Sequence, residues 1–166
     1  MARRALLLVT RGAQRPAAQA FCRIGLGLLP LAATATNRHP VHRAARPGLQ
    51  GLAPRTGLGA NVAVRRGGEL MFLCNFEGPR APKSYTQAGH TAPLHATSIG
   101  KCLLTGLSPK ERRRLLGDPL DAHTEYTTTS HDLLDTEIET VRRTGYAVEA
   151  EERALGRASL AAPVRD

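Results

Sequence analysis

The chain has 166 residues, a formal net charge of +9 and 42% hydrophobic residues. This length allows one domain, or one domain and a fragment of another, and the composition is close to that of an ordinary globular protein. The three cysteines lie far apart without CxxC spacing, which argues against a secreted disulfide framework and favours a reducing, cytoplasmic environment.

The N-terminal 50 residues carry the excess positive charge. They contain eight arginines and no acidic residue, whereas the rest of the chain has 15 basic and 14 acidic residues. A basic arm indicates contact with nucleic acid or an anionic surface, and an exposed leader is the alternative. The composition also permits a transit peptide. The apolar run at residues 5–9 is too short for a signal peptide, and residues 24–35 are too few for a membrane helix, so no membrane partner is expected.

Residues 37–56 have the apolar spacing of an amphipathic helix, but proline and glycine interrupt it. Pro47 and Pro54 each remove a backbone donor, and Gly48 and Gly51 lower helix propensity. We therefore predict a connector with a broken helix in this segment.

The pattern after Gly57 predicts a β-hairpin. Residues 61–66 alternate in polarity, residues 69–76 form a second β-prone run, and Gly67-Gly68 between them suits a two-residue turn. Residues 83–87 are predicted as a third strand and residues 89–93 as a loop.

Two short helices are predicted next. The first covers residues 98–107. The second begins with Ser108 as N-cap and Pro109 in the first helical position, and Glu111 completes a capping box. It is expected to end near Gly117.

A third helix is predicted over residues 131–144, between a Ser130 cap and a Gly145 stop. Glu139 and Arg143 lie four residues apart and are expected to pair. Its buried stripe is predicted to consist of Leu134, Ile138 and Val141.

The remaining segments are predicted to be extended. Residues 125–129, 146–148 and 158–164 are β-prone, and residues 149–153 form an acidic loop between the last two strands. Hairpins without repeating strand–helix units predict an α+β fold with a mainly antiparallel sheet flanked by helices.

The candidates for a catalytic nucleophile or base are Cys74, Cys102, His90 and His95. No nucleophile elbow or phosphate-binding loop accompanies them, and Cys102 falls in an apolar helical stripe. The histidine pairs, His39 with His42 and His90 with His95, lack acidic or cysteine partners nearby, so no metal or other cofactor is predicted. We predict that the chain is not an enzyme.

Residues 93–101 better suit a ligand-sensing pocket. They pass from extended chain into a helix around Thr97 and Ser98. The first turn of a helix leaves unsatisfied N–H groups where a small carboxylate can dock, although Thr97 or Ser98 could simply cap the helix.

Two long stretches carry a family resemblance. Residues 76–101 (FEGPRAPKSYTQAGHTAPLHATSIGK) and 141–166 (VRRTGYAVEAEERALGRASLAAPVRD) resemble, in order and spacing, the two signatures of the IclR family of bacterial transcriptional regulators. The resemblance implies an N-terminal winged helix-turn-helix, a linker and a GAF-like effector-binding domain. Applied to this chain, it assigns residues 1–29 to the end of the helix-turn-helix, 30–56 to the linker and 57–166 to the effector domain.

The chain departs from the family plan at both ends. The body of the helix-turn-helix is missing from the sequence, so major-groove reading is not expected of this chain even though the intact family binds DNA. The family's final strand and helix are missing as well. An unpaired sheet edge would follow, and we expect a product of low stability or one that self-associates as a homodimer or homotetramer.

The resemblance also implies a pocket for a small-molecule acid. Effector contacts would fall at Ser98, Ile99, Glu149 and Ser159. Walls of the pocket would fall at Ala81, Ser84, Ala92 and Arg157, which makes the pocket roomier or more polar than one lined by leucine and methionine. We therefore expect an organic or aromatic acid that differs from the smallest keto acids.

Two other functions stay open. The chain could be a ligand-independent oligomerisation remnant, or an enzyme on a GAF-like scaffold. A ligand that binds only the folded state raises the melting temperature, and this response separates the sensor from the remnant.

Overall fold

The computed structural model describes residues 26–81 and 87–164. The chain divides into two units, Met1–Arg43 and Ala44–Asp166. The described part of the first unit holds helix α1, Leu28–Arg38, which buries none of its residues, and the start of α2, Pro40–Thr56. Within the described residues, no helix is both long and apolar enough to span a membrane.

Helix α2 is continuous, so the predicted break was wrong. Pro47 and Pro54 lie inside it, although an internal proline costs about 3 kcal/mol. Tertiary contacts hold its last turns. Ala53 is almost fully buried, a Cβ on Gly78 would meet the Ala53 carbonyl oxygen at 2.5 Å, and the Arg80 guanidinium donates to the Thr56 carbonyl. Packing therefore overrides local propensity here.

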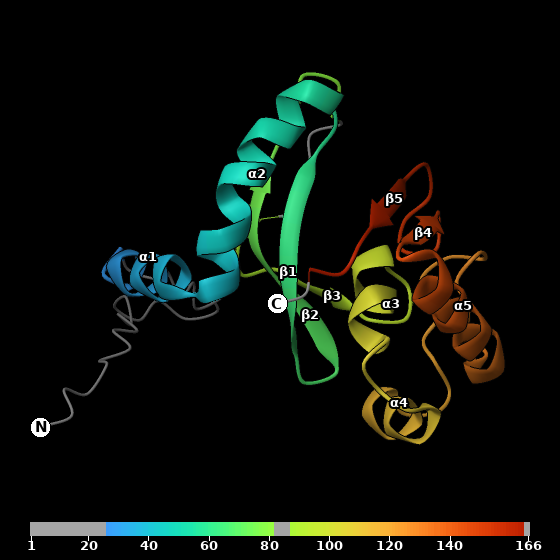
Figure 1. The fold of residues 1–166 in the computed structure, drawn as a ribbon. Coiled ribbons are helices and arrows are strands. Elements are labelled where there is room, and N and C mark those ends of the chain that lie inside the picture. Colours follow the sequence, from blue (N-terminus) through green and yellow to red (C-terminus); the bar gives the residue numbers. More distant parts are fainter. Residues whose placement is uncertain (1–25, 82–86, 165–166) are drawn as a thin grey trace, which may run out of the picture. The chain divides into compact units, whose positions relative to one another are not determined.

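Sheet A is antiparallel with strand order β1-β2-β3 (Figure 1). β1 is Ala60–Arg66, β2 is Glu69–Phe76 and β3 is Thr91–Pro93. The predicted hairpin is confirmed, with a positive φ of 61° at Gly67.

Residues 91–93 form β3 and not the predicted loop. The strand pairs with the start of β2, with Leu70 opposite Ala92. A short edge strand that ends in proline gives little local signal. The strand predicted at residues 83–87 lies almost wholly outside the described residues.

Sheet B is a separate antiparallel pair, so the described strands form two sheets within the predicted α+β class. β4 is Ala147–Ala150 and β5 is Ala158–Ala161. Alternation buries Ala147 and Glu149 and leaves Val148 and Ala150 exposed.

Residues 125–129 form no strand, contrary to prediction. Thr127 organises a turn here, because its hydroxyl oxygen accepts from the N–H groups of His123 at 3.0 Å and Thr124 at 2.9 Å. The β-branched side chains that suggested a strand are instead used as local hydrogen-bond partners.

The three helices after β3 begin where they were predicted, but the first ends three residues earlier than predicted. α3 is Ser98–Leu104, α4 is Pro109–Leu116 and α5 is His131–Thr144. The predicted capping box on α4 is confirmed, as are the Ser130 cap, the left-handed Gly145 stop and the buried stripe of α5.

The ion pair predicted on α5 was wrong, because Glu139 pairs with Arg142 and not with Arg143. Glu139 Oε2 lies 3.2 Å from Arg142 Nη1, three residues away. The Arg142 guanidinium also donates to the Thr105 and Leu107 carbonyls beyond α3. These contacts fix Arg142 in reach of Glu139 and leave Arg143 outside the pair.

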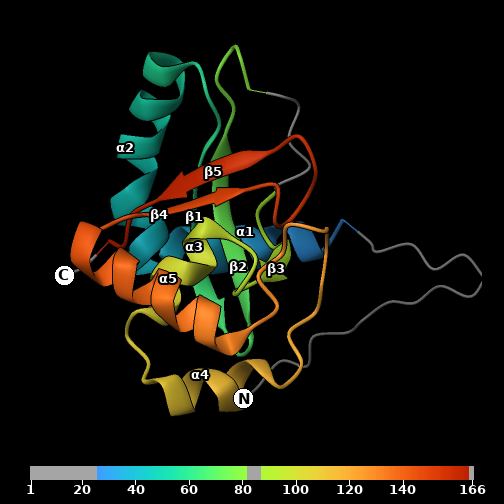
Figure 2. The same cartoon turned by 90° about the vertical axis from the view of Figure 1, so that its right-hand side faces the viewer.

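Helix α3 contacts strands of both sheets and α5 (Figures 1 and 2). Leu94, Leu104, Leu134 and Ile138 have no exposed surface and belong to one core cluster. Ile99 packs against this cluster and also against a second one around Cys102 and Val141. The hydrophobic core therefore surrounds α3.

We expect Ser108→Ala to destabilise the protein by about 1 kcal/mol, because the N-cap supplies a hydrogen bond to an otherwise unpaired N–H group. Hydrogen bonds from Ser108 lower the pKa of Glu111. The contribution of Glu111 is therefore present at neutral pH and is lost as the pH falls through its folded-state pKa. Urea unfolding at pH 7 and pH 3 measures both effects, and an equal loss at the two pH values would contradict the capping-box account.

Candidate functional site

Thr97 caps helix α3 and leaves Ser98 free for another contact. The Thr97 hydroxyl accepts from the Gly100 N–H at 3.1 Å and donates to the Pro93 carbonyl at 2.8 Å. Ser98 follows as the first helical residue, with only 1% of its surface exposed. The alternative that Ser98 is a capping residue is therefore wrong.

Three predicted site residues meet in one hydrogen-bonded trio of Ser98, Ser159 and Glu149. Ser98 Oγ lies 2.7 Å from Ser159 Oγ, and the Ser159 hydroxyl donates to Glu149 Oε2 at 2.9 Å. Ser159 and Glu149 are cross-strand partners in β4 and β5. Since Ser159 gives its single proton to the carboxylate, Ser98 must donate to Ser159.

The Glu149 carboxylate is almost buried, with 4% exposure. Its other oxygen, Oε1, accepts the Arg153 N–H at 3.2 Å, and within the described residues it makes no ion pair. A carboxylate has about four acceptor sites, so it can take a further donor from a ligand. The trio thus offers one strong acceptor beside two hydroxyl groups.

A buried lysine fixes the loop that follows Glu149. Lys101, one turn after Ser98 on α3, is 2% exposed and forms an ion pair with Glu152. Its Nζ also lies 2.9 Å from Glu137 Oε2 on α5. The Thr127 hydroxyl donates to the Glu152 carbonyl at 2.7 Å. The acidic loop is thereby tied to α3, α5 and the Thr127 turn.

The other predicted site residues do not join the trio. Ile99 packs in the core, Ala92 is buried in the core cluster, Ala81 is half-buried and Arg157 is exposed. Ser84 lies outside the described residues. Of the seven predicted positions that the structure describes, three come together.

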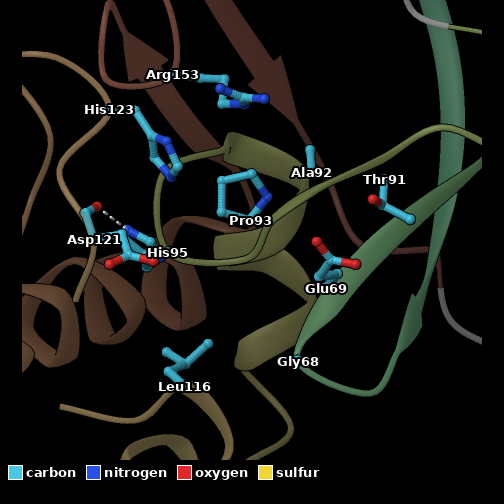
Figure 3. A pocket seen from close by; sticks show the side chains of 10 residues that line it. All are labelled: Gly68, Glu69, Thr91, Ala92, Pro93, His95, Leu116, Asp121, His123 and Arg153. Atoms are coloured by element: carbon cyan, nitrogen blue, oxygen red, sulfur yellow. Dashed lines mark hydrogen bonds between the residues drawn. The ribbon is translucent and has the colours of Figure 1, made fainter. Parts of the chain in front are cut away.

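A pocket of about 340 Å³ lies beside β3 (Figure 3). Its walls come from the β1–β2 turn and the start of β2, from β3 itself, from residues 116–123 and from Arg153. Ala92 lines it, whereas no residue of the trio does.

The two described cysteines are poor nucleophiles. Burial raises the pKa of the Cys74 and Cys102 thiols, and the Cys102 thiol donates to the Ala161 carbonyl. A raised pKa reduces the thiolate fraction that nucleophilic chemistry requires. In the described part of the chain, no group of three or more His, Cys, Asp or Glu side chains has a metal-binding arrangement.

Comparison with known families accounts for most of the chain. The model of the bacterial transcriptional regulator IclR C-terminal family matches residues 33–166. The chain belongs to the IclR family. The predicted family and α+β class are thus confirmed.

Individual IclR-family proteins are also similar to this chain in sequence and in structure. BhcR, an HTH-type transcriptional regulator of Paracoccus denitrificans, is 34% identical over 123 residues, which cover 74% of this chain and 44% of BhcR. The Thermotoga maritima IclR structure has a TM-score of 0.78 at 26% identity and covers 86% of this chain and 58% of its own.

A third relative was solved with a ligand. The inducer-binding domain of PobR from Acinetobacter, as a double mutant in complex with 3-hydroxybenzoic acid, is 30% identical with a TM-score of 0.65. The match covers 74% of this chain and 73% of that domain. The matched proteins are transcriptional regulators and not enzymes, as predicted, and this chain spans about half the length of the curated relatives.

Lys101 was not among the predicted site residues. Its partners Glu137 and Glu152 are 36 and 51 residues away along the chain, so no local pattern pairs them. The available signal was a lysine inside the apolar helix SIGKCLL, because a buried lysine requires an acidic partner.

Proposed function

We propose that this chain is the effector-binding part of an IclR-type transcriptional regulator and that it binds a small hydroxylated organic acid at the trio. The supporting observation is the convergence of Ser98, Ser159 and Glu149 from α3, β5 and β4 in one hydrogen-bonded group. Polar groups fixed in this way can orient a ligand that binds against them.

The charge of Glu149 selects the ligand chemistry. A carboxylate ligand placed directly against Glu149 would be repelled, whereas a hydroxyl on the same ligand gives Glu149 a donor. The serine hydroxyls can then rotate to serve the ligand carboxylate. The complex of the PobR inducer-binding domain double mutant with 3-hydroxybenzoic acid supports an aromatic hydroxy acid as the ligand class.

The bound effector would act on a DNA-bound assembly. We infer that the effector controls a DNA-bound homodimer or homotetramer, because the relatives are HTH-type transcriptional regulators. Effector binding can shift such an assembly only if its affinity differs between the two states.

Isothermal titration calorimetry tests the effector site with 3-hydroxybenzoate, benzoate and pyruvate. We expect 3-hydroxybenzoate to bind most tightly. Glu149→Gln should reduce the preference for 3-hydroxybenzoate over benzoate at least about tenfold, since a hydrogen bond to a charged group contributes about 1.5–3 kcal/mol. Ser159→Ala should lower the binding affinity for 3-hydroxybenzoate by a similar factor.

The matched control is Glu139→Gln on α5, an exposed carboxylate outside the trio, which should leave binding unchanged. Binding of pyruvate without binding of either aromatic acid would refute the proposed ligand class. An equal loss in the control variant would refute the role of the trio.

One observation favours the ligand-independent oligomerisation remnant as a second candidate. Val148 and Leu160 are cross-strand partners on the outer face of sheet B, and they are 56% and 69% exposed. An apolar pair of this kind suits self-association. Sedimentation at several concentrations, with and without 3-hydroxybenzoate, separates the candidates, because the remnant would associate without responding to the acid.

A further inference from the structure

The pocket beside β3 contains a cluster of basic groups that the trio does not use. Two histidine rings, His95 and His123, stack with centroids 5.6 Å apart and an interplanar angle of 28°. Arg153 lies across the pocket from β3 (Figure 3). These three residues come from separate segments, so the fold assembles the cluster.

Hydrogen bonding fixes one ring and leaves the other available. His95 is buried, and its Nε2 donates to the Asp121 carbonyl at 2.8 Å. The His123 ring has no hydrogen bond within the described residues. The inner ring therefore serves as a platform for the outer ring, which faces the pocket.

The local charge at His123 is positive. Burial lowers the pKa of His123, the charges of Arg153 and His95 lower it further, and Asp121 acts in the opposite direction. In the described part of the chain, the Arg153 guanidinium has no hydrogen-bond or ion-pair partner. Glu69 lies on the far wall beside Thr91 (Figure 3). An anion between Arg153 and His123 would offset the unfavourable charge of Arg153 and would therefore favour the protonated His123 ring.

The pocket also has apolar lining residues that could contact the apolar part of a small ligand. Pro93 of β3 and Leu116 of α4 are among its lining residues. Its volume of about 340 Å³ lies at the lower end of the range for small-molecule sites, about 300–1,000 Å³. The dimensions suit one small ring or a short chain.

We propose that this pocket is a second binding site, which takes a small organic carboxylate between the Arg153 guanidinium and the His123 imidazolium. The site stands independently of the effector site, because the two share no lining residue. Benzoate is the organic probe, and inorganic phosphate is the probe for a bare oxyanion.

Histidine-selective NMR of the full chain tests the proposal by titrating pH with and without each probe. The His123 resonance is assigned with His123→Gln. Benzoate favours the protonated ring, so it should raise the pKa of His123 by about one pH unit, which corresponds to roughly tenfold tighter binding to the imidazolium form. Benzoate affinity should accordingly fall as the pH rises through that pKa.

Three variants separate this site from the trio. Arg153→Gln removes the guanidinium but keeps the backbone N–H that donates to Glu149. It should lower the affinity for benzoate, measured at His123, at least about tenfold. Ser159→Ala should leave the His123 response intact even if it abolishes effector binding. Glu69→Gln, on the far wall, should not lower the affinity for benzoate.

A His123 pKa that benzoate does not change would overturn the proposal, and so would an undiminished response in Arg153→Gln. A response to phosphate alone would also overturn it, because the site would then take a bare oxyanion and not an organic acid. Loss of the His123 response in Ser159→Ala would assign benzoate to the trio instead.

Discussion

Gly100→Ala is expected to destabilise the domain by about 3 kcal/mol or more, or to prevent cooperative folding. A Cβ at Gly100 would lie 2.5 Å from Leu94 Cα and 2.6 Å from its carbonyl carbon. These are backbone atoms of a fully buried residue, so they cannot move aside as a flexible side chain would. Overpacking of this kind separates α3 from the end of β3.

The matched control is Gly106→Ala, two residues beyond α3. A Cβ there would meet nothing within 4 Å, and we expect a change within about 0.5 kcal/mol. Urea unfolding followed by circular dichroism measures both variants. Equal stability of the two would show that α3 does not need the close approach to Leu94.

Lys101→Met is the second substitution with a large expected effect, about 3–5 kcal/mol of lost stability. The change removes the partner of Glu152, which is buried, and of Glu137. Breaking a buried ion pair from one side leaves a charge without compensation, and this costs more than the intact pair contributes.

A double variant separates the loss of charge pairing from the change of side-chain shape. Lys101→Met with Glu152→Met removes both charges and should recover part of the stability. Lys110→Met, on the exposed surface of α4, should be near neutral. If the double variant were no more stable than Lys101→Met alone, packing of the lysine stem and not its charge would account for the loss.

Elements defined by local chemistry were predictable from the sequence. The Gly67-Gly68 turn and the Ser108–Glu111 capping box depend on residues within a few positions of one another, and both are where they were expected. The α+β class followed from these elements.

Elements that depend on distant partners were not predictable. β3 exists because Ala92 pairs with Leu70, and α2 stays continuous through Pro47 because its C-terminal turns are packed. The same holds for Lys101, whose acidic partners lie on α5 and in the acidic loop.

The candidate site was predictable by resemblance but its geometry was not. Ser98, Glu149 and Ser159 were identified as positions, while the order of proton donation through Ser159 to Glu149 required atomic distances. The basic cluster at His123 had no signal in the sequence, because stacking of His95 on His123 depends on the fold of residues 117–130.

The surroundings of α3 limit how its sequence can diverge. Ser98 donates within the trio, Gly100 touches the Leu94 backbone, Lys101 pairs with the acidic loop and Cys102 bonds to β5. Four of its seven residues thus each contact a different neighbouring residue. A single compensating substitution elsewhere therefore cannot accommodate changes at more than one of these four positions. Among IclR-type chains, ligand preference should therefore drift through the strands and loops around this helix, while the helix itself tolerates the fewest replacements.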